Sequence, residues 1–437
     1  MSIAVPSTHS SQKLTLTSDL GLLFLSIILQ IGLGLLFGHV YDMRIFMATG
    51  YLVGTGQNPY IAQDLSNVFN NPIFQGITTI GYLPPWALVL GVIYRCVYAV
   101  FHNLVVYNLA IKIPVIAANI GLAYLVVDVL KKLGVDSKVS RRAWVFLLLN
   151  PFLLYFGSAW GQFDALVACL SLGSIILLYD GRYNWSAVLL ALAISFKPIA
   201  LPLLPVVLIF LDGKSRWQAV RYLGLFILSV LLFCIAPFIL FHWDPSPIIK
   251  GWNAHFMVGG GMSFMTFFEL LKDAYQLPGL WWLLGLAWIP ALGVGIYVLI
   301  STQKLAQKST QELANKLDER DLTNLITMST ALIFIFFLTR AWLSEPNVTL
   351  LIPFVVILTS IGALPSLTLT AVWTLPLAFT IFNTSPPQLL FLNFPDAMVK
   401  YLRLSDQFRF ARLIIRTILV IPWQIAGWWM VVACFKK

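Results

Sequence analysis

The sequence predicts an all-α fold, a polytopic bundle of transmembrane helices. Of its 437 residues, 59% are hydrophobic and only 11% are charged, and the mean hydropathy is +0.85. Soluble globular domains carry about 25% charged residues, so this composition excludes a water-soluble protein. Apolar runs long enough to cross about 30 Å of hydrocarbon follow one another along the chain. No polar connection is long enough for a separate soluble domain, and we therefore expect one integral membrane domain over residues 1–437.

The apolar runs predict about 10 to 12 membrane segments, some of them broken or re-entrant. They lie near 20–38, 80–101, 104–130, 143–158, 164–180, 186–211, 221–241, 280–300, 323–339, 348–363, 367–383 and 412–434. The first run is longer than a signal-peptide core and lacks a small-residue cleavage site after it. We interpret it as an uncleaved first helix.

Loop charge predicts which connections share a side of the membrane, since cytoplasmic loops carry an excess of Lys and Arg. The basic stretches 131–142, 212–221 and 301–322, together with the C-terminus, are placed inside. The net charge of +10 is then explained by basic residues that orient the loops across the membrane, and no nucleic-acid partner is expected. The multi-pass chain is expected in the plasma (inner) membrane.

Two runs conflict with a simple count of crossings. Before the basic loop at 131–142 one run must be a half-helix or lie along the interface, and the best candidate is 80–101, which opens with Pro84-Pro85. The run 186–211 has the same problem and contains Lys197-Pro198. We expect it to go out and return as two broken halves, with Lys197 at the turn.

With these two exceptions, one outer face collects every candidate polar site. The connections assigned to it are 39–79, 159–164, the Lys197 turn, 242–279, 340–347 and 384–411. In the last of these, apolar and basic residues alternate, which is typical of an interfacial helix. A lid that contacts substrate is the alternative.

Asp42 follows the first apolar run directly. A charged side chain at membrane depth costs roughly 2.5 to 3.5 kcal/mol, so it indicates a functional site. A carboxylate at the membrane edge can act as the general base for an attacking hydroxyl. A helix cap or a solvated loop charge is the alternative.

Trp160-Gly161-Gln162-Phe163-Asp164 follows Asn150-Pro151 and brings an aromatic ring, an amide and a carboxylate together. Sugars bind such groups through their hydroxyls and their C–H faces. An interfacial Trp anchor with Asp164 as N-cap of the next helix is the alternative.

Three further charges are candidates for substrate binding. Lys197 could meet a phosphate or extend to the lipid headgroups. Arg340 and Glu345 place both signs at the mouth of a helix, where they could also form an internal salt bridge.

The ordered series of short motifs resembles the type C glycosyltransferases, polytopic enzymes that take a sugar from a polyprenyl-phosphate carrier. The pattern is closest to the GPI mannosyltransferase I group and its prokaryotic mannosyltransferase-like relatives. The motifs are Tyr41-Asp42-x-Arg44-x-Phe46, Gly56-x-Asn58-Pro59-Tyr60, Tyr82-Leu83-Pro84-Pro85, Asn150-Pro151, Trp160-Gly161-Gln162-Phe163-Asp164, Ser195-Phe196-Lys197-Pro198 and Ser344-Glu345.

The resemblance covers 20–211 well and implies a catalytic module there, with the outer loop 39–79. The region 212–437 would supply more variable helices with the outer loops 242–279 and 384–411. Beyond 211 the resemblance is carried only by Arg340 to Asn347.

The resemblance also implies an inverting transfer of a hexose from the polyprenyl-phosphate donor to a lipid-linked or glycan acceptor at the outer face. Mannose is the hexose it favours. The membrane lipid is the remaining partner. Asp42 is the implied catalytic base, and the donor phosphate is assigned to Lys197. The implied substrate-binding residues are Arg44, Tyr82, Trp160, Gln162, Asp164, Lys197, Arg340 and Glu345.

Two departures from the eukaryotic pattern matter. Arg44 stands where that pattern has a second acid, so the motif does not support a divalent metal, and no cofactor is expected. Gly161 to Asp164 replaces an Arg-Gly-Asn triplet, which leaves the sugar open.

Two other function classes fit a polar membrane chain. A transporter or lipid flippase usually shows internal repeats with a site at the midplane, and the 39–85 pattern has no second copy. A polymerase or ligase of lipid-linked glycans depends on a large outer loop rich in Arg and His, which this chain lacks.

Overall fold

The computed structural model describes residues 16–255, 260–275, 285–309, 317–383 and 385–436, and it confirms the predicted all-α fold. The N-terminal half contains α1 (Leu16–Leu36), α2 (Val40–Gly54), α3 (Ser66–Phe69), η1 (Pro72–Phe74), α4 (Pro84–Ile93), η2 (Tyr94–Tyr98), α5 (Ala99–Phe101), α6 (Leu104–Lys132), α7 (Ser137–Leu149), α8 (Pro151–Leu153), η3 (Leu154–Trp160), α9 (Asp164–Tyr179), α10 (Tyr183–Phe196), η4 (Pro198–Ala200) and α11 (Leu203–Lys214).

The C-terminal half contains α12 (Arg216–Val230), η5 (Leu231–Ile235), α13 (Ala236–Leu240), α14 (Ser246–His255), α15 (Met265–Tyr275), α17 (Trp288–Ser309), α18 (Leu317–Thr339), η6 (Glu345–Leu350), α19 (Ile352–Ser360), α20 (Ser366–Ile381), α21 (Ser385–Gln388), α22 (Pro395–Gln407) and α23 (Arg409–Phe435). The strands β1 (Gly260–Gly261) and β2 (Trp342–Leu343) pair in parallel.

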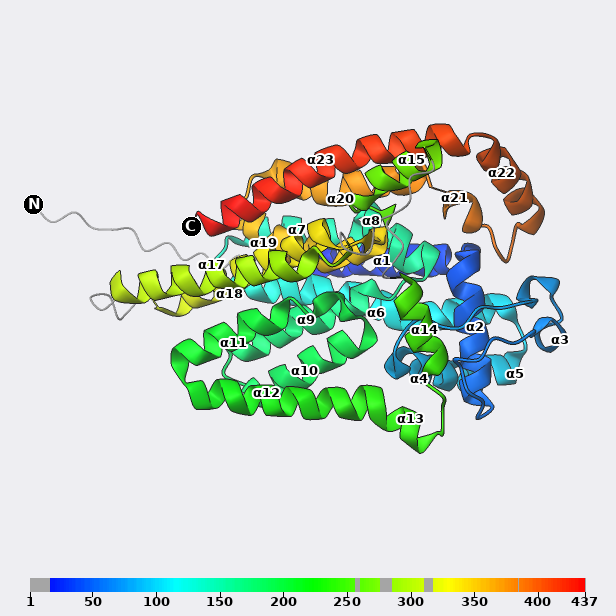
Figure 1. Ribbon diagram of the computed structural model, residues 1–437, viewed down its shortest axis with the longest axis horizontal. Coiled ribbons are helices and arrows are strands. Elements are labelled where there is room, and N and C mark those ends of the chain that lie inside the picture. The colour runs from blue at the N-terminus through cyan, green and yellow to red at the C-terminus, as the bar shows by residue number, and fades with distance from the viewer. Residues whose placement is uncertain (1–15, 256–259, 276–284, 310–316, 384, 437) are drawn as a thin grey trace, which may run out of the picture.

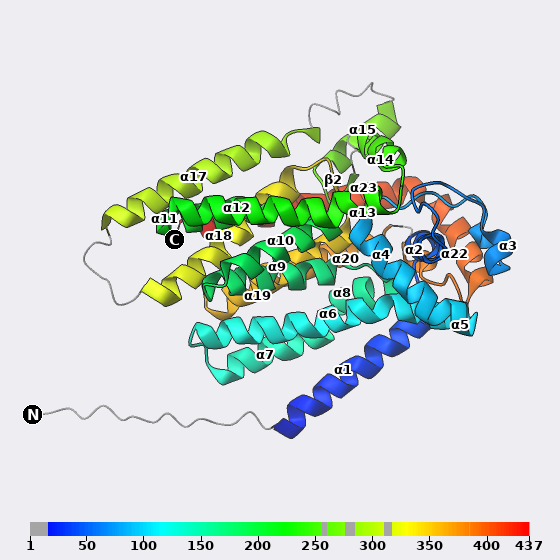
Figure 2. The ribbon, with the colours of Figure 1, turned by 90° about the horizontal axis from the view of Figure 1, so that it is seen from below.

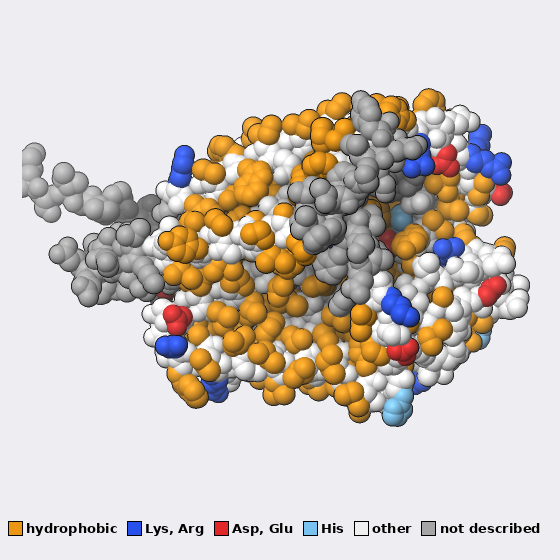
Figure 3. All heavy atoms as spheres, viewed as in Figure 1, with side chains coloured by type: hydrophobic (Ala, Val, Ile, Leu, Met, Phe, Trp, Pro, Cys, Tyr) orange, Lys and Arg blue, Asp and Glu red, His pale blue; other side chains and the backbone are white. Residues whose placement is uncertain are grey.

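The long helices run along one axis of an elongated bundle (Figure 1). In the described part of the chain, seven helices are long and apolar enough to cross a membrane, and five shorter apolar helices accompany them. A broad belt of hydrophobic side chains covers the middle of the face seen in Figure 3, and charged side chains gather toward its two ends. This is the surface of an integral, multi-pass membrane protein.

The connections predicted to lie inside share one end of the bundle. The turn from α6 to α7, the turn from α11 to α12, and the C-terminus lie at the left in Figure 1 and Figure 2. The end of α17 and the start of α18 lie there too, while residues 310–316 between them are outside the described residues. We call this the basic end, and the opposite one the site end.

The run 80–101 forms a helix that begins at Pro84-Pro85, as the double proline predicts. By length and composition it could cross a membrane. The structure instead places α4 and α5 beside α2 at the site end (Figure 1, Figure 2). Whether this run crosses the membrane therefore stays a prediction.

The run 186–211 is split into two helices, as predicted. α10 ends at Phe196, Lys197 has extended backbone with φ −156°, and α11 begins at Leu203 after η4. Proline restricts the preceding residue to extended conformations, so Pro198 fixes this turn.

The predicted outer loop 39–79 needs one correction, because its first third is the helix α2. α2 lies across the site end, upright in Figure 1 and seen end-on in Figure 2. It packs closely on α4, and a Cβ on Gly50 would stand 2.8 Å from the Leu90 carbonyl oxygen. The buried side chains of Met43, Phe46 and Met47 show why a helix forms where polar residues suggested a loop.

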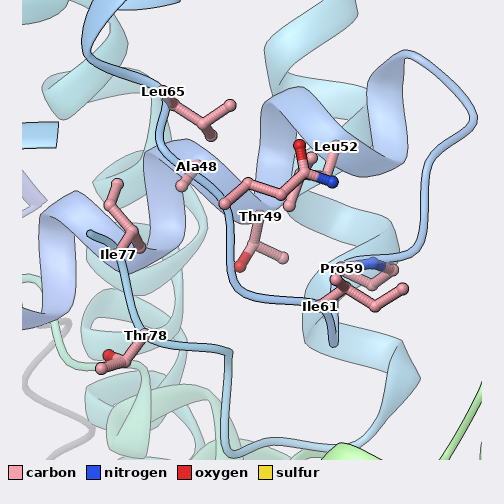
Figure 4. A pocket seen from close by; sticks show the side chains of 9 residues that line it. Ala48, Thr49, Leu52, Pro59, Ile61, Leu65, Ile77 and Thr78 are labelled. Carbon is pink, nitrogen blue, oxygen red and sulfur yellow. The ribbon is translucent and has the colours of Figure 1, made fainter. Parts of the chain in front are cut away.

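Between α2 and the following loop lies a small void of about 10 Å³, lined by Thr49, Leu52, Pro59 and Ile77 among others (Figure 4). A cavity of about 10 to 15 Å³ holds one water molecule. This void is therefore too small for a sugar.

The segment 384–411 contains the predicted surface helix as α22, in which only Met398 is buried. Residue 384 is outside the described residues. The Asn393 side chain donates to the carbonyls of Leu35 and Leu36, both at 2.9 Å. These bonds satisfy two carbonyls at the C-terminal end of α1.

Candidate active site

Asp42 lies in the first turn of α2 with its side chain 14% exposed. The indole Nε1 of Trp160 donates to its Oδ2 at 2.5 Å. His39 is the N-cap of α2, and its ring stacks on Trp160 with centroids 3.9 Å apart. Its Nδ1 is 3.2 Å from the same Asp42 oxygen, within ion-pair distance. Asp42 is thus neither the cap nor a solvated charge.

A tight turn brings Trp160 onto α2. η3 ends at Trp160, and Gly161 follows with φ +99°, a conformation that favours glycine. A Cβ on Gly161 would lie 2.5 Å from the sulfur of Met43. Glycine therefore permits the contact between the two segments that carry Asp42 and Trp160.

The surroundings of Asp42 keep it ionised. Burial alone would raise its pKa, but the contact and charge of His39 and hydrogen bonds from Trp160 and Gln162 hold the pKa below its ordinary 3.8. A low pKa weakens the carboxylate as a base. It suits a hydroxyl whose proton becomes acidic only as its oxygen bonds to carbon.

This shift predicts a pH dependence of stability. A folded pKa below the unfolded one stabilises the protein fully above about pH 4, and this contribution is lost as the pH falls through the folded pKa. The difference in melting temperature between wild type and Asp42→Asn should shrink as the pH falls from about 4 through the folded pKa. A difference that grows over this range would show that the folded pKa is raised.

Asp164 and Lys197 form a buried ion pair. Lys197 Nζ lies 2.9 Å from Oδ1 and 2.8 Å from Oδ2 of Asp164, whose side chain is 1% exposed. The ammonium also faces the rings of Tyr82 and Phe163, each 5.4 Å from the centroid. The N-cap of α9 is Phe163, so Asp164 does not cap the helix, and Lys197 points inward instead of toward the headgroups.

Arg340 and Glu345 lie on the segment around β2 and have different partners. No ion pair joins them in the part of the chain that the structure describes. Arg340 lies over the Phe336 ring at 5.0 Å, and its Nη1 is buried without a partner. Burial lowers the pKa of Arg340 to about 10, opposed by the charge of Asp164, so the guanidinium stays cationic at neutral pH.

Glu345 is 4% exposed and accepts a hydrogen bond from Asn383 Nδ2 at 3.2 Å. Arg416 Nη1 in turn contacts Asn383 Oδ1 at 3.4 Å. The charges of Arg416 and His39 both act on the Glu345 carboxylate. The late acidic motif therefore lies near His39 at the start of α2.

Strand β1 fixes the segment that carries Arg340. The hydroxyl of Ser263 donates to the Arg340 carbonyl at 2.6 Å, and the Met262 amide donates to the Leu343 carbonyl at 2.8 Å. The backbone is therefore held at Arg340 and at Leu343, and the Arg340 side chain keeps a free donor.

Tyr82 connects these groups into one site. Burial, then the charges of Asp42 and Asp164, raise the pKa of Tyr82 well above its ordinary 10.0, while a hydrogen bond with Gln162 opposes the shift. The neutral phenol therefore lies among Asp42, Gln162 and the Asp164–Lys197 pair. We call the set Asp42, Tyr82, Trp160, Gln162, Asp164, Lys197, Arg340 and Glu345 the polar cluster.

The polar cluster and its neighbours contain buried polar atoms that have no protein partner. They are Gln162 Oε1, Arg340 Nη1, Tyr155 Oη, Asn347 Oδ1 and Arg416 Nε. Leaving a buried polar group unsatisfied costs about 1 to 3 kcal/mol. Several such groups from separate helices facing one region indicate a binding site for a polar ligand.

Arg44 is the one predicted site residue that the structure does not bring to the polar cluster. Two residues along a helix turn a side chain about 200° away, and Arg44 Nη1 instead donates to the Ile73 carbonyl at 2.9 Å. It fixes the loop after α2 against that helix.

Sequence reasoning missed His39, Tyr155, Asn383 and Arg416 around the polar cluster, and also Lys112. Lys112 is 0% exposed, and its ammonium donates to the carbonyls of Phe37 at 2.5 Å and Ala159 at 2.9 Å. These carbonyls lie beside the segments that carry Asp42 and Trp160. A lysine within an apolar run was a signal of the same kind as Asp42.

Lys112→Met should therefore disturb the site as well as the fold. It removes the Lys112 donor from the Ala159 carbonyl before Trp160, while the Phe37 carbonyl keeps only the Asn108 amide at 2.9 Å, and we expect the loss to cost about 1 to 3 kcal/mol. We also expect kcat to fall in the fraction that remains folded. Thermal unfolding and activity per folded molecule measure the two effects, and Lys400→Met, an exposed lysine of α22, is the control. Wild-type kcat in folded Lys112→Met would contradict the positioning role.

Among the described residues, no three His, Cys, Asp or Glu side chains are grouped so as to hold a metal ion.

Comparison with known proteins agrees with the resemblance seen in the motifs. Residues 40–212 match the family described as alpha-(1->6)-mannopyranosyltransferase, N-terminal domain. This stretch is less than half of the chain, and it carries Asp42, Tyr82, Trp160 and Lys197. No curated protein sequence matches the chain. Among solved structures, ArnT from Cupriavidus metallidurans, crystallised with undecaprenyl phosphate, aligns with 96% of this chain and 77% of its own at 12% identity and a TM-score of 0.44.

Proposed function

We propose that this chain is a polytopic glycosyltransferase that moves mannose from a polyprenyl-phosphate carrier to a lipid-linked or glycan acceptor at the outer face of the membrane, with inversion at the anomeric carbon. The observation that carries the proposal is the polar cluster: an ionised Asp42 beside Trp160 and Gln162, with buried, unpartnered donors on Arg340 and Arg416 nearby.

The chemistry needs a base, a sugar site and a phosphate site. The acceptor hydroxyl oxygen bonds to the anomeric carbon while the bond from that carbon to the phosphate oxygen breaks. The hydroxyl proton passes to Asp42, and the electron pair leaves with the polyprenyl phosphate. Because the donor is already activated and membrane-anchored, orienting the reactants and stabilising the leaving phosphate account for the protein's task.

We assign the sugar site to Trp160, Gln162 and Tyr82. The rings of Trp160 and Tyr82 can pack on the C–H face of a hexose, and the free Oε1 of Gln162 can accept a hydrogen bond from a sugar hydroxyl. Glu345, held by Asn383, is an acceptor for a further hydroxyl.

We assign the phosphate site first to Arg340, with Arg416 as a second ligand. Both guanidinium groups have a buried nitrogen without a partner, whereas the ammonium of Lys197 is bonded to both oxygens of Asp164. Arginine also suits a phosphate through its planar, forked donors. Lys197 then contributes the one ammonium donor that is not bonded to Asp164.

Mannose is supported by the family description, which names an α-linked mannopyranosyl product. With inversion, an α-linkage is made from a β-linked donor. The proposed donor is accordingly a β-linked mannosyl phosphate on a polyprenol.

Reconstituted protein tests the proposal with labelled mannosyl-phosphopolyprenol, its glucosyl and galactosyl counterparts, and GDP-mannose. We expect transfer of mannose only from the lipid donor, with an α-linked product identified by NMR. Asp64→Asn, an exposed acid in the loop after α2, is the matched control for Asp42→Asn and should retain full activity. Transfer from GDP-mannose, or a product that keeps the β configuration, would overturn the proposal.

A further inference from the structure

A second cavity lies near the basic end, far along the bundle from Asp42. Its volume is about 250 Å³, and its apolar wall is formed by Leu20 and Leu23 of α1, Tyr124 and Val127 of α6, and Trp144 of α7. α1 meets the bundle near its C-terminal end and diverges from α6 and α7 toward its N-terminal end (Figure 2). Leu20 and Tyr124 are each more than half exposed, so the cavity is open to surrounding lipid.

Polar groups without partners line the same cavity. Ser140 is 3% exposed and Trp144 is 7% exposed, yet the Ser140 hydroxyl and the Trp144 Nε1 have no hydrogen-bond partner. Buried donors in this state cost stability unless a ligand satisfies them. Oδ2 of Asp19 is a third buried atom without a partner.

The charges at the rim favour an anion that also carries a hydroxyl. Lys131 and Arg141 line the cavity with Asp19, and Arg141 Nε is bonded to Asp19 Oδ1 at 3.0 Å. Two cations against one anion leave a net positive charge beside two free donors, which matches a phosphate. The free oxygen of Asp19 can accept a bond from a headgroup hydroxyl.

We propose that this cavity is a binding site for an anionic glycerophospholipid of the phosphatidylglycerol type. One acyl chain lies between α1, α6 and Trp144, the phosphate lies at Lys131 and the Ser140 and Trp144 donors, and the glycerol headgroup faces Asp19. The cavity is slightly below the 300–1,000 Å³ or so of small-molecule sites, so it encloses part of the lipid and leaves the rest in the bilayer. The site does not depend on glycosyl transfer.

The sharpest test removes the two free donors. In Ser140→Ala with Trp144→Phe neither lost donor had a protein partner, so the expected cost to the lipid-free protein is only that of the smaller ring at position 144, and Ser140→Ala alone tests one donor without that cost. Phosphatidylglycerol is titrated into delipidated protein, and binding is followed by native mass spectrometry. The affinity of the first phosphatidylglycerol molecule to bind should fall by about tenfold or more in the double variant. Phosphatidylcholine should bind more weakly than phosphatidylglycerol to wild type.

Lys131→Gln and Lys138→Gln form a matched pair for charge. Both remove one exposed lysine from the stretch 131–142, but only Lys131 lines the cavity. We expect Lys131→Gln to weaken phosphatidylglycerol binding and Lys138→Gln to leave it unchanged. Equal affinity of the donor-free variant and wild type, equal binding of the two lipids, or equal effects of the two lysine variants would each overturn the proposal.

Discussion

Asp42→Asn is expected to lower kcat for sugar transfer by about 10²- to 10⁴-fold, the range that a positioned general base contributes. The amide keeps the size of the side chain and can still contact Trp160, but it cannot take the proton of the attacking hydroxyl. Donor KM should change little, because the phosphate and sugar contacts lie on other residues. Initial rates over a range of donor concentration measure both parameters.

Retention of near-normal kcat in folded Asp42→Asn would remove Asp42 as the base. The comparison with Asp64→Asn separates loss of chemistry from a general effect of charge at the site end. Asp42→Asn is also expected to melt at a lower temperature than wild type above pH 5. Its activity must therefore be expressed per folded molecule.

Lys197→Met should have the largest effect on stability, at about 3 to 5 kcal/mol, because it leaves the Asp164 carboxylate buried and unpaired. Asp164 is 1% exposed, so water cannot replace the lost ammonium. The exposed pair Lys132–Asp180, with a contact of 2.6 Å, provides the control. Unfolding by titration with SDS measures both variants, and Lys132→Met should cost less than about 1 kcal/mol.

The double variant Asp164→Leu with Lys197→Met separates structure from function. Replacing both members of a buried pair with apolar residues is often neutral for stability, so folding should largely recover. Transfer should not recover, since the proposed phosphate site has lost the remaining ammonium donor of Lys197, and donor KM should rise. A double variant that is both stable and fully active would show that the pair is structural only.

The sequence was sufficient for most of the fold, because hydrophobic run length determines which segments can cross a bilayer. The break at Lys197 was readable from Pro198, because proline restricts its own backbone and that of the residue before it. Loop charge correctly grouped the connections at the basic end. α2 was missed as a helix because Asp42 and Arg44 made its sequence look like a polar loop.

The site was only partly predictable. Asp42, Trp160, Gln162, Asp164, Lys197, Arg340 and Glu345 could be named because polar residues are rare in such a chain. Which of them pair could not, since the Asp164–Lys197 bond joins the start of one helix to the end of the next. The direction of Arg44 was also out of reach, because it depends on α2 being helical.

A single outer active site requires that the segments carrying Asp42 and Arg340 lie on the same side of the membrane, and cysteine labelling tests this most directly. In a background with Cys96, Cys169, Cys234 and Cys434 replaced by Ala, Tyr41→Cys and Trp342→Cys place exposed thiols beside the polar cluster. Lys138→Cys and Arg216→Cys place them at the basic end. We predict that an impermeant maleimide labels positions 41 and 342 on intact cells and reaches 138 and 216 only after permeabilisation. Labelling of 41 and 342 from opposite sides of the membrane would contradict a single outer active site.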